Sequence, residues 1–295
     1  MSQDLWATSR QTSLRVLAHD APRSASPVVV VLHGLETSVD MLSGSVPGVD
    51  PLAALADQGL HVLALDWPGH GRSGGRRGHL TYRLAMEAAA TAVDTALDRW
   101  PGAPVGLLGT ALGGVLAFYA ALEDDRVGAA VCHNVLDLRD VRPVLQRWRQ
   151  ATLLPVAARL ARGLTFDAQT KVPVPAPAVV ADADLASPQL ARALRHHPQA
   201  VRTYDLAGLA SILLAPEDKP DIAAGRAPTL VAVGSGDRVL PETTTRAFVA
   251  RLTCPHELWV LPGGGHQLLL EHHRAFVPVA ADFLLRHLGA APPEP

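Results

Sequence analysis

Three glycine-rich stretches of the sequence carry residues whose types suit nucleophilic catalysis. The first, LLGTALGG, is centred on Ala111, and the other two, GSGDRVLP and GGGHQLLLE, carry Asp237 and His266. In acyl transfer an acid orients a histidine, and the histidine takes a proton from a nucleophile held at a sharp turn. The spacing of glycines around Ala111 suits such a turn.

The surroundings of Ala111 match a nucleophile elbow, which joins a buried strand to a helix with the pattern G-x-S-x-G. The central residue of an elbow has a strained backbone, and Gly109 and Gly113 leave the space that side chains would otherwise fill. The helix that follows directs N–H groups and the positive end of its dipole toward the turn. The nucleophile position itself holds alanine, which has no nucleophilic atom.

His266 and Asp237 each follow a predicted core strand. Glycines 263–265 free the backbone to bring the imidazole of His266 close to the turn. A surface histidine and a capping aspartate are the ordinary alternatives, and we favour the catalytic interpretation of both residues. Asp137, which follows another strand, is the weaker rival for the acid.

Other polar residues are expected to have structural roles. His33 is predicted to brace the loop after its strand, while Asp66 and His70 support a nearby turn. A solvated loop is expected to contain Arg72, Arg76 and Arg77. The histidine pairs at 196–197 and 272–273 lack the spacing to a third ligand, so no metal site is predicted.

The elements that must position these residues alternate along the chain. Strand-length apolar runs lie at Leu14–Ala18, Val28–Leu32, His61–Asp66, Val105–Gly109, Val127–Val135, Thr229–Asp237 and Glu257–Pro262. Helices are predicted at Pro51–Asp57, Tyr82–Trp100, Gly113–Leu122, Glu242–Arg251 and Ala275–Leu288. This alternation favours an α/β fold with a mostly parallel sheet covered by helices on both faces.

Residues 138–221 interrupt the alternation and contain no clear strand run. They include an amphipathic stretch, Val141–Leu164, and the proline-rich segment KVPVPAPAVV. We therefore predict a core of residues 1–137 and 222–295 with a helical insertion at 138–221. The insertion is either a decoration on the core or a cap that encloses an apolar pocket.

Composition excludes several classes of protein. Hydrophobic residues make up 48% and charged residues 18% of the 295 residues, which is typical of a globular protein with a large core. The net charge of −2 offers no basic excess for nucleic acid. Cys132 and Cys254 do not make a disulfide scaffold, and no signal peptide is visible, so we expect a cytoplasmic protein. The uncharged stretch Trp100–Leu122 contains prolines and glycines, which favours a buried strand and helix over a membrane span.

Together these motifs resemble the α/β-hydrolase superfamily, and within it the monoacylglycerol lipase and lysophospholipase-like branch. HGLE (His33–Glu36) is similar to the oxyanion loop, and LDWPGHGRSGGRRGH (Leu65–His79) is similar to a specific stretch of that branch. The order nucleophile, acid, histidine is also that of the superfamily. The resemblance implies a cap at 138–221 and an oxyanion hole formed by the backbone N–H groups of Leu35 and Leu112.

The resemblance also implies hydrolysis of a carboxylic ester or related acyl bond in a lipophilic small molecule, without cofactor or metal. A serine at position 111 would attack the carbonyl, His266 would carry its proton to the leaving alcohol, and Asp237 would hold the imidazole. Ester, lactone, thioester, amide and C–C bonds all suit this site. The sequence specifies neither the bond nor the oligomeric state.

Alanine at position 111 admits three explanations. One is a laboratory Ser→Ala replacement, which leaves an inactive enzyme. The second is a natural pseudoenzyme that binds a ligand, and the third is a natural lyase, cyclase or isomerase that uses the Asp237–His266 pair as a general base. We favour the first, because the strained turn and the intact acid and histidine loops suit a covalent step.

Overall fold

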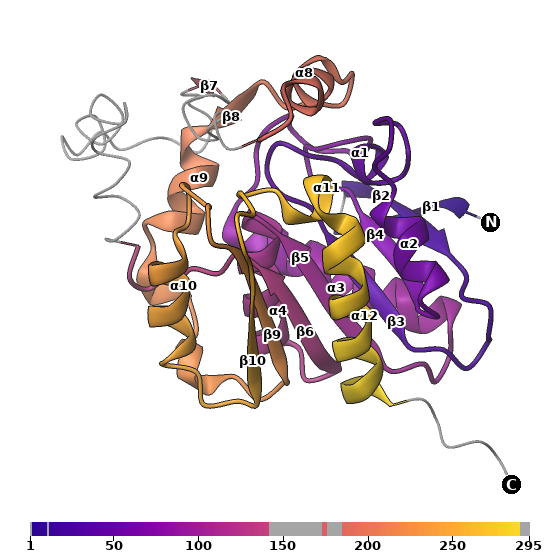
Figure 1. Cartoon of the computed structure of the whole chain (residues 1–295). Coiled ribbons are helices and arrows are strands. Elements are labelled where there is room, and N and C mark those ends of the chain that lie inside the picture. The colour runs from indigo at the N-terminus through magenta and orange to yellow at the C-terminus, as the bar shows by residue number, and fades with distance from the viewer. Residues whose placement is uncertain (1, 11, 142–172, 176–184, 290–295) are drawn as a thin grey trace, which may run out of the picture.

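An eight-stranded sheet forms the centre of the molecule (Figure 1). The computed structural model describes residues 2–10, 12–141, 173–175 and 185–289. Across the sheet the strands are β1 (Ser2–Ser9), β2 (Thr12–His19), β4 (His61–Leu65), β3 (Val28–Leu32), β5 (Val105–Thr110), β6 (Val127–His133), β9 (Thr229–Gly234) and β10 (His256–Leu261). All pairings from β4 to β10 are parallel, and β1 and β2 add an antiparallel edge.

Helices cover both faces of this sheet. One face carries α3 (Tyr82–Arg99), α4 (Leu112–Glu123) and α10 (Glu242–Val249), and the other carries α2 (Pro51–Asp57) and α12 (His273–Leu288). Every residue of the central strand β3 is therefore buried, which explains its unbroken run of valine and leucine. The predicted mostly parallel sheet between two helical layers is confirmed.

The largest difference from the predicted core is β1, which the sequence does not predict. Its burial alternates between exposed and half-buried, so it has no apolar run to reveal it. It is held instead by pairing along its whole length with β2 and by the ion pair between Asp4 and the buried Arg15. Two short helices also escape prediction, α1 (Val39–Leu42) and α11 (Leu268–Glu271).

Residues 138–221 are described at 138–141, 173–175 and 185–221. They form α8 (Pro188–His196), α9 (Leu206–Leu213), the short 3-10 turn η2 (Pro216–Asp218) and an antiparallel pair of β7 (Pro173–Pro175) with β8 (Thr203–Asp205). The expectation of a segment without strands is therefore wrong. Apart from its first residue, the predicted amphipathic stretch Val141–Leu164 lies outside the described residues.

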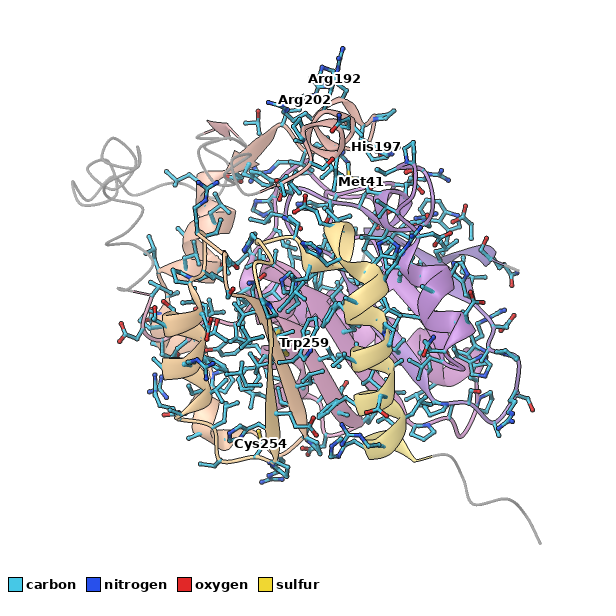
Figure 2. The ribbon with its side chains drawn as sticks, in the orientation of Figure 1. Met41, Arg192, His197, Arg202, Cys254 and Trp259 are labelled. Atoms are coloured by element: carbon cyan, nitrogen blue, oxygen red, sulfur yellow. The ribbon has the colours of Figure 1, made fainter. Side chains whose placement is uncertain are left out.

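Part of the insertion, α8 with β7 and β8, lies at the carboxyl ends of the central strands, and α9 runs down beside the sheet (Figure 1). Figure 1 shows α8 and β8 beyond that end of the sheet, and Figure 2 places Arg192 and Arg202 there, far from Cys254 at the opposite end. In the parts of 138–221 that the structure describes, no strand joins the eight-stranded sheet. The division into a core and a cap stays a prediction.

The loop from Gly69 to His79 binds the insertion. The N–H of Asp205 donates to the carbonyl of Gly78 at 3.0 Å, and the Asp205 carboxylate accepts from Nδ1 of His79 at 2.7 Å. Gly78 has a φ of +72°, and a Cβ there would lie 2.1 Å from the carbonyl oxygen of Thr203. Glycine is therefore required for the insertion to approach the loop this closely.

Two arginines of this loop also bind the insertion. Arg76 forms an ion pair with Asp205, and Arg77 donates to the carbonyl of Gln199. Arg72 instead pairs with Asp40 at 3.0 Å. Arg72 and Arg77 are exposed, as expected of a solvated loop, whereas Arg76 is half-buried against Asp205.

The uncharged stretch Trp100–Leu122 contains β5 and most of α4 in the buried core. In the part of the chain that the structure describes, no helix combines the length and the apolar character needed to cross a bilayer.

Candidate active site

The turn between β5 and α4 has the geometry of a nucleophile elbow. Ala111, at its tip, has φ 52° and ψ −124° and caps the amino end of α4. A Cβ on Gly109 would lie 2.0 Å from the carbonyl oxygen of Gly113, and one on Gly113 would lie 2.1 Å from that of Leu32. Both glycines are thus needed for the backbone to turn this sharply, as their spacing indicates.

Asp237 and His266 meet at the same edge of the sheet. Asp237 follows β9, His266 follows the neighbouring β10, and both side chains are buried. Nδ1 of His266 lies 2.9 Å from Oδ2 of Asp237. This is the geometry in which a carboxylate holds Nδ1 as the protonated nitrogen, which makes Nε2 the basic nitrogen of the ring.

The backbone beyond Asp237 keeps its carboxyl group ionised. Oδ1 accepts from the N–H groups of Val239 and Leu240, each at 2.8 Å. Burial alone would raise the pKa of Asp237, but the hydrogen bonds from His266, Leu240 and Val239 outweigh it and hold the pKa below its ordinary value. Asp237 is therefore a fixed anion beneath the imidazole.

Asn134 is a polar neighbour of this pair that the sequence analysis misses. It directly follows β6, and its Nδ2 donates to Oδ2 of Asp237 at 2.7 Å. Its backbone has a φ of 67°, one of three left-handed non-glycine residues among those described. The sequence places Asn134 inside the predicted strand Val127–Val135, so no local signal marks it as a site residue.

The rival acid, Asp137, is bound to other groups. Its carboxylate accepts from the N–H of Arg139 at 2.8 Å, the guanidinium of Arg251 at 2.7 Å and the hydroxyl of Tyr119 at 3.3 Å. Asp237, and not Asp137, is the carboxylate with a hydrogen bond to His266.

His33 braces the loop after β3. Its Nδ1 donates to the carbonyl of Gly34 at 2.6 Å, and its Nε2 accepts from the N–H of Trp67 at 3.2 Å. Burial lowers the pKa of His33 to about 4, so the imidazole is neutral at pH 7. Both nitrogens are engaged, which supports a structural role for His33 rather than one as a base.

The residues expected to supply the oxyanion hole lie beside Ala111. A Cβ on Gly34 would approach Cβ of Ala111 to 3.1 Å, which places Leu35 next to the turn. Leu112 is the first residue of α4, so its N–H has no acceptor within the helix. The hydroxyl of Tyr204, from β8 of the insertion, donates to the carbonyl of Leu35 at 2.6 Å and holds that loop.

The other predicted supporting residues are also fixed by hydrogen bonds. Asp66 accepts from the N–H groups of Val39 and Arg72, at 2.8 and 3.0 Å. His70 contacts the carbonyl of Pro68 at 3.0 Å. In the described ranges, no three His, Cys, Asp or Glu side chains gather as metal ligands.

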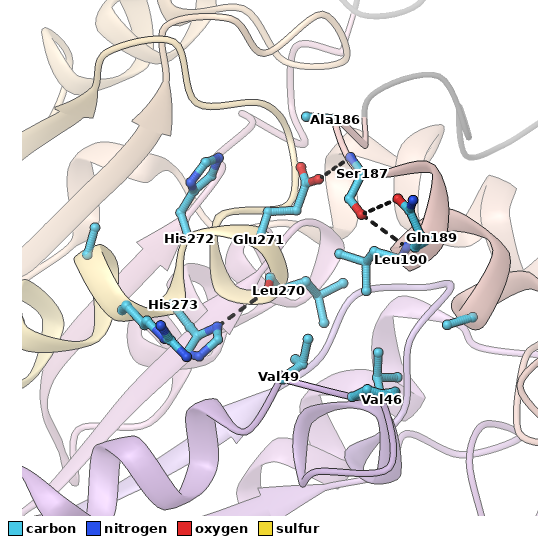
Figure 3. Close-up of a pocket in the computed structure, with 15 residues that line it drawn as sticks. Val46, Val49, Ala186, Ser187, Gln189, Leu190, Leu270, Glu271, His272 and His273 are labelled. Atoms are coloured by element: carbon cyan, nitrogen blue, oxygen red, sulfur yellow. Dashed lines mark hydrogen bonds between the residues drawn. The ribbon is translucent and has the colours of Figure 1, made fainter.

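A cavity of about 770 Å³ lies where α8 meets the loop before α2 and the helices α11 and α12 (Figure 3). The loop at Val46–Val49, the start of α8 and the junction of α11 with α12 line it. Glu271 and Ser187 contact each other at its wall, with the N–H of Ser187 3.0 Å from Oε1 of Glu271. The lining residues do not include Ala111, Asp237 or His266.

Comparison with known proteins identifies the family. Residues 23–273 match the family described as serine aminopeptidase, S33. The chain belongs to the serine aminopeptidase S33 family. It is also similar to a monoacylglycerol lipase of Mycolicibacterium smegmatis, with 32% identity over 226 residues that cover 74% of this chain and 75% of the relative.

Solved structures show the fold of this S33 family member. The monoacylglycerol lipase of Paleococcus ferrophilus superposes with a TM-score of 0.68 at 20% identity, covering 93% of this chain and 99% of that one. Est1E of Butyrivibrio proteoclasticus with bound ferulic acid gives 0.65 at 17% identity, covering 96% and 99%. The predicted α/β-hydrolase fold and the predicted likeness to monoacylglycerol lipases are confirmed. The family and its relatives support a serine hydrolase of the esterase or lipase kind.

Proposed function

We propose that this chain carries the site of a serine hydrolase of lipophilic carboxylic esters, in which Ala111 stands where the parent enzyme has its nucleophilic serine. The buried hydrogen bond between Asp237 and His266, beside the elbow, carries the proposal. The substrate class rests on the relatives, which include monoacylglycerol lipases and an esterase that binds ferulic acid.

In the form with serine at position 111, the hydroxyl oxygen attacks the ester carbonyl while Nε2 of His266 takes its proton. The N–H groups of Leu35 and Leu112 bind the oxyanion that forms. The C–O bond then breaks, and His266 returns the proton to the departing alcohol. A water molecule, deprotonated by the same imidazole, releases the acid from the acyl-enzyme and regenerates serine.

The chain with Ala111 forms no acyl-enzyme, because a methyl group offers no lone pair. It retains the imidazole of His266, the Asp237 carboxylate and the residues of the oxyanion hole, so it binds an ester and leaves it intact.

Both cysteines are buried free thiols, and we propose a cytoplasmic location on that ground.

The test compares the chain as given, Ala111→Ser, and Ala111→Ser combined with His266→Ala. Each is assayed on a monoacylglycerol and on medium-chain nitrophenyl esters, and each is treated with a fluorophosphonate. We expect the serine variant alone to label at position 111 and to exceed the other two by on the order of 10³-fold or more. A serine variant that neither labels nor hydrolyses any ester would refute the proposal.

A second function is favoured by the intact Asp237–His266 pair in a chain without a nucleophile. In this second function, His266 acts directly as a general base on substrate or water, as in a lyase, cyclase or isomerase. This route requires that the chain as given turn over its substrate and that His266→Ala abolish the turnover. Full activity with Ala111 in place would select this second function over the first.

A further inference from the structure

Asn134 and His266 both donate hydrogen bonds to the same oxygen atom of Asp237. Oδ2 of Asp237 accepts both Nδ1 of His266 at 2.9 Å and Nδ2 of Asn134 at 2.7 Å, while Oδ1 accepts two backbone N–H groups. A carboxylate has about four lone-pair positions, so all of them are used. Asn134 thus completes the set of donors that holds this anion.

The orientation of the Asn134 amide is set by the carboxylate. If its oxygen and nitrogen were exchanged, Oδ1 would face Oδ2 of Asp237 at hydrogen-bond distance, and two acceptors would repel each other. With Nδ2 toward Asp237, Oδ1 is buried and has no hydrogen-bond partner among the described residues. A buried acceptor without a partner is unfavourable, and the bond from Nδ2 to the charged carboxylate offsets that cost.

The backbone restricts which residue can supply this donor. Asn134 has a φ of 67° and its own N–H donates to the carbonyl of Ala232 at 3.1 Å, so it is fixed in the left-handed region. Glycine, asparagine and aspartate tolerate that region best. Of these, asparagine alone carries a side-chain N–H, and a φ of this kind at a buried non-glycine residue often marks a functional position.

We infer that Asn134 is a positioning residue of the active site: its amide fixes the Asp237 carboxylate so that Oδ2 holds the Nδ1 proton of His266. The inference rests on the proposed function in that His266 is the base. The imidazole also lies near a second, fully buried ring, since the ring centroids of His133 and His266 are 6.3 Å apart. Asp237, Asn134 and His133 are thus polar groups near His266 that come from the end of β6 and from the loop after β9.

Two variants separate positioning from a structural role, and both can be studied in the chain as given. Asn134→Gly keeps the left-handed backbone and removes the donor. Asn134→Asp keeps the shape, but at this distance its carboxyl group and that of Asp237 cannot both ionise, and they share one proton. Arg10→Gly is the matched control, because Arg10 also has a left-handed φ, of 51°, but lies in the turn between β1 and β2.

The readout is NMR of the chain labelled with ¹⁵N-histidine. We expect exchange of the His266 Nδ1 proton with solvent to quicken at least tenfold in Asn134→Gly. In Asn134→Asp the proton shared by the two carboxyl groups takes the place of the amide donor, so exchange should stay closer to the parent rate than in Asn134→Gly. Arg10→Gly should leave the exchange rate unchanged. If Asn134→Gly lowers stability but leaves the His266 signals as they are, the amide is structural and the inference is wrong.

The same substitutions in the Ala111→Ser background give the second readout. There we expect Asn134→Gly to lower kcat by about tenfold to a hundredfold with KM changed less than twofold. If Ala111→Ser is inert while the NMR changes occur as expected, the proposed hydrolysis fails and the positioning role of Asn134 stands. If Ala111→Ser is active and Asn134→Gly changes neither kcat nor the NMR signals, the hydrolysis stands and the positioning role fails.

Discussion

Three fully buried histidines make the folded chain sensitive to mild acid. Burial lowers the pKa of His33 to about 4 and the pKa values of His70 and His133 to about 3. In the unfolded chain a histidine has a pKa of about 6.5. Between these values the unfolded state binds a proton that the folded state does not, so stability is full above pH 6.5 and falls as the pH drops.

The size of the loss follows from the difference between the two states. At pH 5.5 each of the three residues lowers the free energy of unfolding by about 1.4 kcal/mol relative to pH 7.5, and together they lower it by roughly 4 kcal/mol. Asp66 acts in the opposite sense, because burial raises the pKa of its carboxyl group and the folded state then takes up the proton first. A loss of this size is a large share of the ~5–15 kcal/mol that stabilises a typical protein.

The assay is urea unfolding at pH 7.5, 6.5 and 5.5, with the free energy of unfolding extrapolated to water. In His70→Asn the amide can replace the Nδ1 donor to Pro68, so the loss between pH 7.5 and 5.5 should shrink by about a third. His196→Asn, on the exposed end of α8, is the control and should keep the full loss. A free energy of unfolding that changes by less than about 1 kcal/mol over this range would refute the reasoning.

Two further substitutions test the backbone around the site. Ala111→Gly should raise the free energy of unfolding by about 1 kcal/mol. Relief of the left-handed φ of Ala111 stabilises the fold by about 1–3 kcal/mol, which exceeds the cost of the added entropy of glycine in the unfolded chain. A decrease in the free energy of unfolding, measured with urea, would contradict this. Tyr204→Phe removes the hydrogen bond to Leu35, so it should lower the free energy of unfolding by about 1–2 kcal/mol and speed amide hydrogen exchange at residues 35–37. Exchange as slow as in the parent would show that Tyr204 does not hold the loop.

The sequence predicts the parts of the site that depend on local spacing. Gly109 and Gly113 reveal the elbow because the backbone contacts that exclude a side chain there come from residues close in sequence or from an adjacent strand. The apolar runs of the central strands are visible because both of their faces are covered. Asp237 and His266 could be paired because each follows a strand, and the carboxyl ends of parallel strands meet at one edge.

Residues held by distant partners could not be predicted in this way. Arg77 contacts Gln199, and Tyr204 contacts Leu35, across loops that carry no pattern linking them. Asn134 falls inside the predicted strand Val127–Val135, and it becomes a partner of Asp237 because β6 and β9 are adjacent in the sheet. Edge strand β1 lacks an apolar run because neither of its faces is buried.

The strained turn at Ala111 and the buried polar group around Asp237 give different evidence about the chemistry of the site. The conformation of Ala111 is imposed by its neighbours: α4 begins at once behind it, and its carbonyl already accepts from the N–H of Gly114 at 2.9 Å. Such a turn persists whether or not a nucleophile occupies it. The Asp237–His266–Asn134 group has no comparable explanation in packing, because apolar side chains of similar size would fill the same space without the cost of burying an anion. The evidence for acid–base chemistry in this chain is therefore that group. The elbow adds only the position at which a serine nucleophile would lie.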